Sequence, residues 1–511
     1  MSLQRIISLP GVKRDGTDLD GNYYSDATWC RFQRGLPRKI GGYRAANNSL
    51  TGISRALFTQ SKDGNQYFHS GHGNGVEQFL LTPTGAGSLV ADRTPAGYVG
   101  SDTRSWQFDG QYDNTSSKSV LVAHSGNNVL NPSDTTNYPI YSGDMYASSA
   151  LVVNTLNANL PAGGVSGGIV SLAPYMIAYG SDGFWANSVS GKPLDFTNTG
   201  SQATQITHQK IIKGLPLRGG GGYSPAGLFW SIDSVIRSNF TGGSTVFQHD
   251  QLTTQSSIIS DRSVIENDGI YYWCGVDRWL MYNGVIQEIP NNLNLNWFFD
   301  GLNREHAGKV FATKVPRYGE IWWCYPRGNA TECSHAVIYN YREKTWYDTP
   351  LPSSGRSAAA QAENVIGGVM TSWVPNLSSA YDFWQHETGT DELNGSVVNA
   401  IKSNFTTATM TMLSSEQPSG EGLSIGPMLP DFVQTGDMTV KALKWNNPKD
   451  GPYEGGTYTI YANPANAYQQ ITPMKETAKI LQLQFESNVQ GGDYQMGQTM
   501  AYIEKDGNKD L

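Results

Sequence analysis

Short apolar runs separated by turn-forming residues dominate the chain from about residue 50 to residue 390. In each unit, an apolar run leads into a Gly, Asp or Asn turn, then an aromatic run, a second turn and a further run. Such runs, bounded by such turns, predict short β-strands joined by hairpins. No long segment of this region keeps a helical period. The pattern therefore predicts consecutive antiparallel strands.

The clearest unit covers residues 263–289 and contains four predicted strands. Asn267-Asp268-Gly269 separates the first two strands, and Asn283-Gly284 separates the last two and predicts a type I′ hairpin. Four short strands in so few residues match one compact propeller blade. The predicted strands are Ser263–Glu266, Ile270–Cys274, Arg278–Tyr282 and Val285–Ile289.

The same unit recurs at a spacing of about 40–60 residues, which suits blades with variable loops. Six units are clear, and residues 358–384 are the candidate for a seventh. A β-sandwich or jelly roll built from similar hairpins is the alternative, but the local repetition favours an all-β propeller of six or seven blades. The other units centre on Ala56–Phe58 with Gln66–Gly71, Trp106–Phe108 with Val120–His124, Ile169–Leu172 with Met176–Tyr179, Leu228–Ile232 with Val246–His249, and Val310–Thr313, Ile321–Tyr325, Ala336–Tyr341 and Thr345–Asp348.

The flanking segments have a different pattern and predict an additional β-rich domain. We expect a leader and platform segment at 1–49, a propeller at 50–390 and a C-terminal β domain at 391–511. Leu481, Leu483 and Phe485 alternate with polar residues and predict a half-buried strand. Gly491-Gly492 then turns the chain into one further strand near residues 494–503.

Composition narrows the class of protein. Charged residues are only 16% of the 511, aromatic residues reach 11%, and there are 57 glycines. Disordered chains are poor in aromatic residues, and helical bundles need Ala, Glu, Lys and Leu in bulk, so both classes are excluded. The net charge of −8 argues against a protein that grips nucleic acid, although DNA could pass such a surface without adhering.

The cysteines and the N-terminus suggest a protein made in the cytoplasm. Four cysteines without a Cys-x-x-Cys pair do not make a disulfide framework, so buried thiols are expected. The first residues lack the apolar core of a signal peptide. No run approaches the length of a membrane span, so a soluble protein is expected.

Three segments invite a ligand-binding interpretation, and each lacks an essential part. The glycine run 219–222 is not followed by Gly-Lys-Ser/Thr, so a turn is favoured over a phosphate loop. His69 and His72 have no third ligand at a recognisable spacing, so a solvated loop pair is favoured over a metal site. The acidic segment 15–21 lacks the first ligand and the final carboxylate of a calcium loop, so a solvated turn is favoured. No metal or cofactor is predicted.

No catalytic signature is present either. The segment Ser181-Asp182-Gly183-Phe184 approaches the repeated Asp-box turn of sialidase propellers, but its spacing differs and it does not recur. No Gly-x-Ser-x-Gly elbow accompanies a plausible triad. We therefore predict that the protein is not an enzyme.

One basic cluster stands out in this acidic chain. It consists of Arg31, Arg34, Arg38 and Lys39, interleaved with aromatic residues. It is a candidate assembly interface, for an acidic partner surface or DNA phosphates. The alternative is a strand with one solvated face.

Three parts of the sequence resemble the tail nozzle (tail tube) proteins of short-tailed, podovirus-type bacteriophages. The first is SLPGVKRDGTDLDGNYYSDATWCRFQRGLPRKIGGY at 8–43, with its Arg-x-x-x-Gly-x-Pro-x-x-x-Gly-Gly-Tyr run. The second is QHETGTDEL at 385–393. The third joins MLPDF at 428–432 with GDYQMGQTMAYIEKDG at 492–507. Their joint order, which brackets the chain, is the stronger part of the resemblance.

The resemblance implies a structural virion protein, made in the host cytoplasm and located in the tail. It implies a homo-oligomeric ring, expected to be a hexamer, below the portal and its adaptor proteins, with tail fibres, spikes or a needle as further partners. The ring would retain packaged double-stranded DNA and conduct it without specific binding. It implies no enzyme activity and no cofactor, and His386 and Glu387 would shape a turn.

Two other classes stay open. The many Trp and Tyr residues suit a carbohydrate-binding or glycan-cleaving propeller, such as a receptor-binding tail component. A bacterial repeat scaffold unrelated to phage is the third class.

Overall fold

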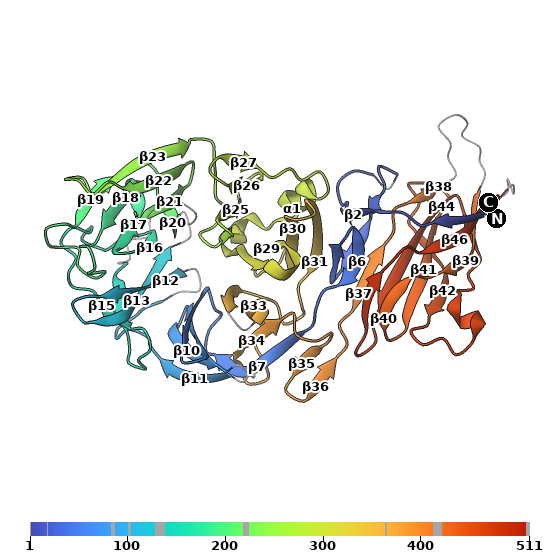
Figure 1. The fold of residues 1–511 in the computed structure, drawn as a ribbon, viewed down its shortest axis with the longest axis horizontal. Coiled ribbons are helices and arrows are strands. Elements are labelled where there is room, and N and C mark those ends of the chain that lie inside the picture. Colours follow the sequence, from blue (N-terminus) through green and yellow to red (C-terminus); the bar gives the residue numbers. More distant parts are fainter. Residues whose placement is uncertain are drawn as a thin grey trace.

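The structure is a computed structural model that describes residues 2–17, 19–82, 87–100, 104–127, 138–217, 224–362, 365–411 and 422–506. It consists of two bodies that lie side by side, a ring of sheets and a smaller β body that holds both chain ends (Figure 1). We call the smaller body the platform. Within the described residues, strands predominate and the helical elements are short. The helical elements are α1 (Leu295–Gly301), η1 (Ser181–Gly183), η2 (Arg304–Lys309), η3 (Pro316–Tyr318) and η4 (Ala467–Gln470).

The ring is a β-propeller with seven sheets among the residues the structure describes. Blades 1 to 6 are four-stranded antiparallel sheets, and each uses four consecutive strands. Blade 1 contains β8 (Ala56–Lys62), β9 (Asn65–His72), β10 (Gly75–Leu81) and β11 (Gly87–Asp92). Blade 2 contains β12 (Arg104–Asp113), β13 (Lys118–Asn127), β14 (Ile140–Asp144) and β15 (Val152–Val153), and blade 3 contains β16 (Gly168–Leu172), β17 (Tyr175–Tyr179), β18 (Phe184–Asn187) and β19 (Gln202–Gln205).

The next three blades follow in the same order. Blade 4 contains β20 (Ile211–Pro216), β21 (Ala226–Ser231), β22 (Val235–Phe240) and β23 (Phe247–Thr253). Blade 5 contains β24 (Val264–Asn267), β25 (Ile270–Cys274), β26 (Trp279–Tyr282) and β27 (Ile286–Glu288). Blade 6 contains β28 (Phe311–Val315), β29 (Glu320–Tyr325), β30 (His335–Asn340) and β31 (Thr345–Pro350).

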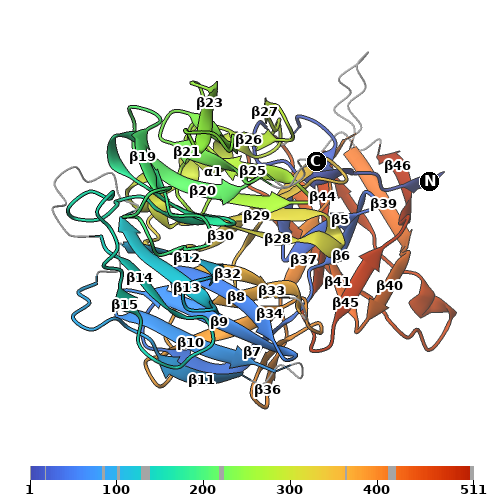
Figure 2. The ribbon, with the colours of Figure 1, turned by 60° about the vertical axis from the view of Figure 1, so that its left-hand side comes forward.

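Blade 7 closes the ring with strands from both sides of the propeller. It takes β32 (Ala358–Ala362), β33 (Val365–Thr371) and β34 (Tyr381–His386) from the end of the repeat. Its fourth strand, β7 (Tyr43–Leu50), comes from before the first blade and runs antiparallel to β34 (Figure 2). The hairpin β35 (Glu392–Asn394) and β36 (Val397–Asn399) extends the same sheet.

Large aromatic side chains fill the space between neighbouring blades. The first strand of each blade lies innermost, where most neighbouring first strands contact one another. Facing sheets must bury their apolar sides, and indole rings bury the most area per residue. The fully buried tryptophans are Trp106, Trp185, Trp230, Trp273, Trp279, Trp322, Trp323 and Trp346.

The predicted propeller is confirmed, and the candidate seventh unit supplies three of the blade 7 strands. The four strands predicted in residues 263–289 are also confirmed. The type I′ turn at Asn283-Gly284 is wrong, because three residues separate Tyr282 from Ile286 and only Gly284 has a positive φ there, of 108°. Two positive φ values, 51° and 79°, occur instead at Asp268 and Gly269, which form the two-residue turn before β25.

The platform consists of sheets that combine both terminal segments. One sheet has the order β1 (Ser2–Arg5), β46 (Met500–Asp506), β39 (Gly422–Leu429) and β43 (Glu476–Ala478). A second has β4 (Asp26–Thr28), β37 (Ser403–Thr406), β44 (Ile480–Ser487), β41 (Met438–Trp445) and β42 (Tyr453–Ile460), with β38 (Met410–Thr411) beside β44. A third has β40 (Phe432–Thr435), β45 (Asp493–Met496), β6 (Leu36–Lys39) and β5 (Cys30–Gln33), and β2 (Leu9–Val12) pairs with β3 (Tyr23–Tyr24).

The terminal segments form one additional β-rich body, as predicted, but its boundaries differ from those expected. Segments 1–49 and 391–511 share their sheets, and residues 43–50 belong to the propeller. β44 is buried on both faces, not half-buried, because Gln482 and Glu486 are buried as well. The expected single strand near 494–503 is two strands, β45 and β46, in different sheets.

The platform packs on the outer strand of blade 6. β2 and β4 contact β31, and the Thr345 hydroxyl donates a 2.8 Å hydrogen bond to the Pro10 carbonyl. At Gly11, φ is +109°, and a Cβ atom would lie 2.5 Å from Leu293 Cδ1 and 2.8 Å from the Trp346 carbonyl oxygen. Only glycine allows the leader to approach blade 6 this closely.

We expect Gly11→Ala to destabilise the protein by on the order of 3 kcal/mol, because it adds backbone strain to a steric clash. The control is Gly64→Ala, since Gly64 has φ +78° and a Cβ added there would meet nothing within 4 Å. Gly64→Ala should lower the free energy of unfolding by about 1 kcal/mol, from backbone strain alone. Calorimetric unfolding of both variants measures the difference, and equal costs would contradict a tight leader contact.

Candidate functional site

The basic cluster predicted as an assembly interface lies on the β5–β6 hairpin. Its side chains do not form one exposed patch. Arg31 and Lys39 are buried, at 1% and 2% exposure, Arg38 is half-buried, and Arg34 is exposed. The cluster therefore cannot act as a four-residue surface, because two of its charges are used inside the chain.

Arg31 joins the platform to two separate parts of the propeller. Its Nε donates to Glu320 Oε1 at 2.8 Å, and its Nη2 donates to Glu320 Oε2 at 3.2 Å. Its Nη1 donates to Glu387 Oε2 at 3.0 Å, and its Nη2 also contacts Glu387 Oε1. Glu320 begins β29 of blade 6, and Glu387 follows β34 of blade 7. One guanidinium thus connects three segments, with the fork geometry that suits paired carboxylates.

Further groups surround this ion pair. The Arg31 guanidinium lies 3.7 Å from the centre of the Tyr318 ring. Tyr347 Oη donates to Glu320 Oε1 at 2.6 Å, and Trp322 Nε1 donates to Glu320 Oε2 at 2.9 Å. Burial raises the pKa of Glu320, although the charge of Arg31 opposes this shift. The pKa of Arg31 is raised, because the charges of Glu320 and Glu387 outweigh the opposing effect of burial.

His386 and Glu387 contribute to the same region. Glu387 has a left-handed backbone, with φ 58°, which turns the chain out of blade 7 and directs its carboxylate to Arg31. Arg356 Nε donates to His386 Nε2 at 2.8 Å. Burial and the nearby Arg356 charge hold the pKa of His386 well below its ordinary value. Glu387 thus joins the two bodies, and the His386 ring lies 6.3 Å from the Trp29 ring of the platform, between ring centres.

The rest of the basic hairpin is also held internally. Lys39 Nζ donates to the Gly492 carbonyl at 2.6 Å, and burial lowers its pKa. The backbone N–H groups of Arg34 and Gly35 donate to the Glu343 carboxylate at 2.5 and 2.9 Å. This leaves the Arg34 side chain as the exposed positive charge of the cluster.

The histidine pair has different surroundings from those expected. His69 and His72 lie on β9 and both are buried, so the predicted solvated loop pair is wrong. His72 Nε2 contacts Glu77 Oε2 at 2.9 Å. Burial lowers the pKa of His69 to about 3. Among the described residues, no group of three or more His, Cys, Asp and Glu side chains could hold a metal ion.

The acidic segment caps a helix. The backbone N–H groups of Asn296 and Trp297 donate to the Asp15 carboxylate at 2.8 and 2.9 Å, at the start of α1. Asp20 pairs with Lys13 at 2.7 Å. Asp18 and the glycine run 219–222 lie outside the described residues.

The four cysteines are buried and free, as predicted. Burial raises the pKa of the Cys30 and Cys333 thiols to about 12, and raises those of Cys274 and Cys324 well above the ordinary value. A thiol in this state is a poor nucleophile. Across the part of the chain that the structure describes, no helix is long and apolar enough to cross a membrane.

Hydrogen bonds cross the centre of the propeller. Ser105 in blade 2 donates its hydroxyl to Asp261, which precedes blade 5. Arg55, which precedes blade 1, donates to the Glu332 carboxylate of blade 6 at 2.8 and 2.7 Å. These blades are not neighbours in the ring. The bonds therefore link blades across the axis, and the axis is not an open channel there.

Ion pairing strengthens this central network. Lys309 Nζ donates to Glu332 Oε1 at 2.5 Å. Burial opposes ionisation of Glu332, but the hydrogen bonds and charges of Arg55 and Lys309 outweigh it and lower the Glu332 pKa. Removing one partner of such a buried pair costs more than the pair contributes, because the other charge is left uncompensated.

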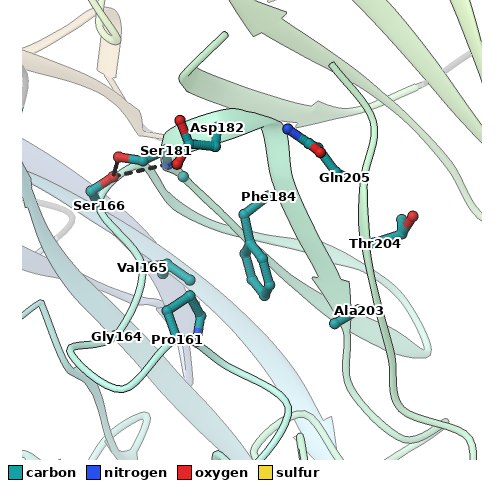
Figure 3. Close-up of a pocket in the computed structure, with 11 residues that line it drawn as sticks. Pro161, Gly164, Val165, Ser166, Ser181, Asp182, Phe184, Ala203, Thr204 and Gln205 are labelled. Atoms are coloured by element: carbon teal, nitrogen blue, oxygen red, sulfur yellow. Dashed lines mark hydrogen bonds between the residues drawn. The ribbon is translucent and has the colours of Figure 1, made fainter. Parts of the chain in front are cut away.

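A sizeable cavity opens on blade 3 (Figure 3). Its volume is about 690 Å³. The turn 181–183 and edge strand β19 border it, and the half-buried Phe184 ring lies between them. Its walls mix hydroxyl, amide and carboxylate groups with apolar side chains, which is the character of a small-ligand site.

Sequence reasoning missed the acidic partners of the basic hairpin. Glu320, with no exposed surface, begins the otherwise apolar run EIWWCY. A carboxylate in a strand buried on both faces requires a buried cation, so this run could have predicted a buried ion pair at Glu320. Nothing local in the sequence indicated that the cation was Arg31.

Replacing Arg31 by leucine should destabilise the protein by about 3–5 kcal/mol, because Glu320 and Glu387 would stay buried without a cation. The matched control is Arg34→Ala, whose exposed side chain should change stability by less than about 0.5 kcal/mol. Chemical denaturation of both variants provides the comparison. Similar costs for the two arginines would mean that the buried pair does not hold the two bodies together.

Acid should destabilise the protein through His69. An unfolded histidine gains its proton near pH 6.5, whereas burial delays His69 protonation to about pH 3. The contribution of His69 to the free energy of unfolding is present above pH 6.5 and is lost as the pH falls towards 3. The loss amounts to about 2 kcal/mol at pH 5.

His69→Gln should therefore reduce the loss of melting temperature between pH 7 and pH 5. The exposed His208 provides the control variant, His208→Gln. Scanning calorimetry at both pH values makes the measurement. An unchanged pH dependence in His69→Gln would rule out the buried neutral histidine.

Comparisons with known proteins give a structural likeness at low sequence identity alone. No family profile and no curated protein matches the sequence. Among solved structures, the chain is similar to the WD40 β-propeller domain of Doa1, at 12% identity and TM-score 0.39, over 67% of this chain and 97% of that one. It is also similar to a chain of the mitotic checkpoint complex, at 10% identity and TM-score 0.39, over 69% and 93%. The chain is a β-propeller protein by its own sheet topology.

Proposed function

We propose that this chain is a structural protein that assembles into a ring, the distal tail channel of a short-tailed phage. The platform carries the proposal, because it exposes apolar side chains in two separate regions. The first region comprises β1, its partner strand β46 and the residues that follow β1. β1 is the edge strand of its sheet and lies at the outer side of the platform (Figure 1). The second surrounds η4. The exposed side chains are Leu3, Ile7 and Tyr502 in the first region and Tyr461, Tyr468 and Ile471 in the second.

Two different patches on one protomer suit a ring. A head-to-tail contact joins one patch of a subunit to the other patch of the next, and it closes when the rotation allows. Leu3 and Tyr502 are directly paired across β1 and β46, at 44% and 38% exposure. Tyr468 in η4 is 87% exposed. Aromatic and aliphatic side chains of this size are typical anchors of subunit interfaces.

The conduit would lie between subunits. The propeller axis is crossed by the Ser105–Asp261 and Arg55–Glu332 bonds, so DNA would pass beside the propellers and not through them. A net charge of −8 suits a wall that DNA passes without adhering. Under this proposal the adaptor proteins, tail fibres, spikes or needle are the other partners, the virion tail is the location, and no catalysis is involved.

A second candidate is a carbohydrate-binding tail component. The observation that favours it is the mixed polar and aromatic cavity beside Phe184 on blade 3. This site and the platform lie in different parts of the molecule, so the two candidate functions do not compete.

The mass of the native assembly tests the ring. Native mass spectrometry of the full chain, alone and with its adaptor, should show a ring of about six times 55.8 kDa, to which any bound adaptor adds its own mass. A strictly monomeric protein under these conditions would overturn the proposal.

Charge introduced at the patches tests the contact itself. Leu3→Asp and Tyr468→Asp should each raise the dissociation constant between subunits by about thirtyfold or more. This is the effect expected when a buried anchor residue of an interface is lost. Tyr112→Asp is the control, because Tyr112 is 54% exposed but lies on blade 2. A ring that forms equally in all three variants would reject the platform contact.

A further inference from the structure

The cavity on blade 3 is built from segments that the rest of the molecule holds in place. The loop 161–166, the turn 181–183, the start of β18 and the edge strand β19 form its walls (Figure 3). A second cavity of about 280 Å³ shares Gly164 with it. The combined volume of the two cavities exceeds that of a single sugar-sized ring. An extended ligand could therefore continue from one cavity into the other.

The turn places a carboxylate at the cavity in a left-handed conformation. Asp182 has φ 54° and ψ 28°, a conformation that Asp adopts more readily than most other residues with a side chain. Gly183 follows with φ +67°, and a Cβ there would lie 1.9 Å from the Thr207 carbonyl oxygen.

Hydrogen bonds on both sides enforce the turn. The Gly180 N–H donates to the Phe184 carbonyl at 3.0 Å, and the Ile206 N–H donates to the Gly183 carbonyl at 3.0 Å. The Ser181 N–H donates to Ser166 Oγ at 3.0 Å. Among the described residues, the Asp182 carboxylate itself has no hydrogen bond or ion pair. The turn thus presents a carboxylate whose acceptor capacity is available to a ligand.

The other walls offer complementary chemistry. Phe184 is half-buried and its ring is directed into the cavity, above Pro161 and Val165 (Figure 3). Gln205 and Thr204 are exposed on the opposite side from the turn. An apolar ring face beside hydroxyl, amide and carboxylate groups matches a sugar, which has an apolar C–H face and a rim of hydroxyl groups.

We propose that this cavity binds a neutral oligosaccharide, with one sugar ring against Phe184 and its hydroxyl groups donating to Asp182. Asp182 is the one ionisable side chain among the described residues that line the cavity. An acidic sugar would meet this negative charge, so neutral sugars are preferred. Glycosidases use two carboxylates, so the site binds without cleaving.

The position of the site suits an exposed role. Blade 3 lies at the opposite end of the long axis from the platform (Figure 1). A ring assembled through the platform would leave this end accessible. The proposal does not rest on the ring, because a monomer would carry the same cavity.

Calorimetric titration and saturation-transfer NMR of the full chain test the site. The neutral probes are maltotriose, cellotriose, triacetylchitotriose and a rhamnose trisaccharide, and trigalacturonate is the acidic probe. At least one neutral probe should bind, and trigalacturonate should not. Binding of no neutral probe, or of trigalacturonate in preference, would overturn the proposal, and so would hydrolysis of a bound probe.

Two variants assign binding to this cavity. Asp182→Asn keeps a residue that tolerates a left-handed backbone, and it should weaken binding about tenfold. Gln205→Ala, on an exposed side chain, should weaken it about fivefold. The controls are Asp268→Asn, in the left-handed Asp-Gly turn between β24 and β25 of blade 5, and Gln248→Ala, on the exposed edge of blade 4. Unchanged binding in both cavity variants, or equal loss in the controls, would place the sugar elsewhere and reject the proposal.

Discussion

The pairing of β7 with β34 is the contact on which the whole molecule depends. Residues 43–50 and 381–386 lie at opposite ends of the repeat, and their antiparallel pairing closes the ring. The cost of closing so long a loop rises only slowly with its length, whereas an open ring would expose two unpaired sheet edges. Closure also brings the two flanks together, since β6 leads into β7 and β34 leads into β35. The platform follows from this closure.

The buried charge of Arg31 then joins the two bodies. Its guanidinium contacts Glu320 of blade 6 and Glu387 at the end of blade 7, so it connects the platform to the last two blades of the ring. Bonds across the axis, such as that between Arg55 and Glu332, tie non-neighbouring blades together. These contacts link the platform to the propeller and non-neighbouring blades to one another.

Local features were readable from the sequence, and long-range features were not. The strands of residues 263–289 were predictable because a hairpin brings together neighbours in the chain. His69 and Lys39 were expected to be exposed, yet both are buried, because their surroundings come from segments distant in the sequence. Lys39 bonds to the Gly492 carbonyl, and His69 lies beside Arg93 and Met145. The cavity beside Phe184 needs three separate segments and had no sequence signal beyond the turn 181–183.

The sequence by itself determined an all-β repeat, since alternating apolar runs and Gly, Asp and Asn turns can bury their apolar sides only as stacked hairpin sheets. It also determined thiols that stay free and a low surface charge. Tertiary structure alone decided that β7 completes blade 7, which strands of the two chain ends pair with one another, and that Arg31 is part of an internal ion pair. The physical reason is that hairpin formation depends on neighbours in sequence, whereas burial and charge pairing depend on neighbours in space.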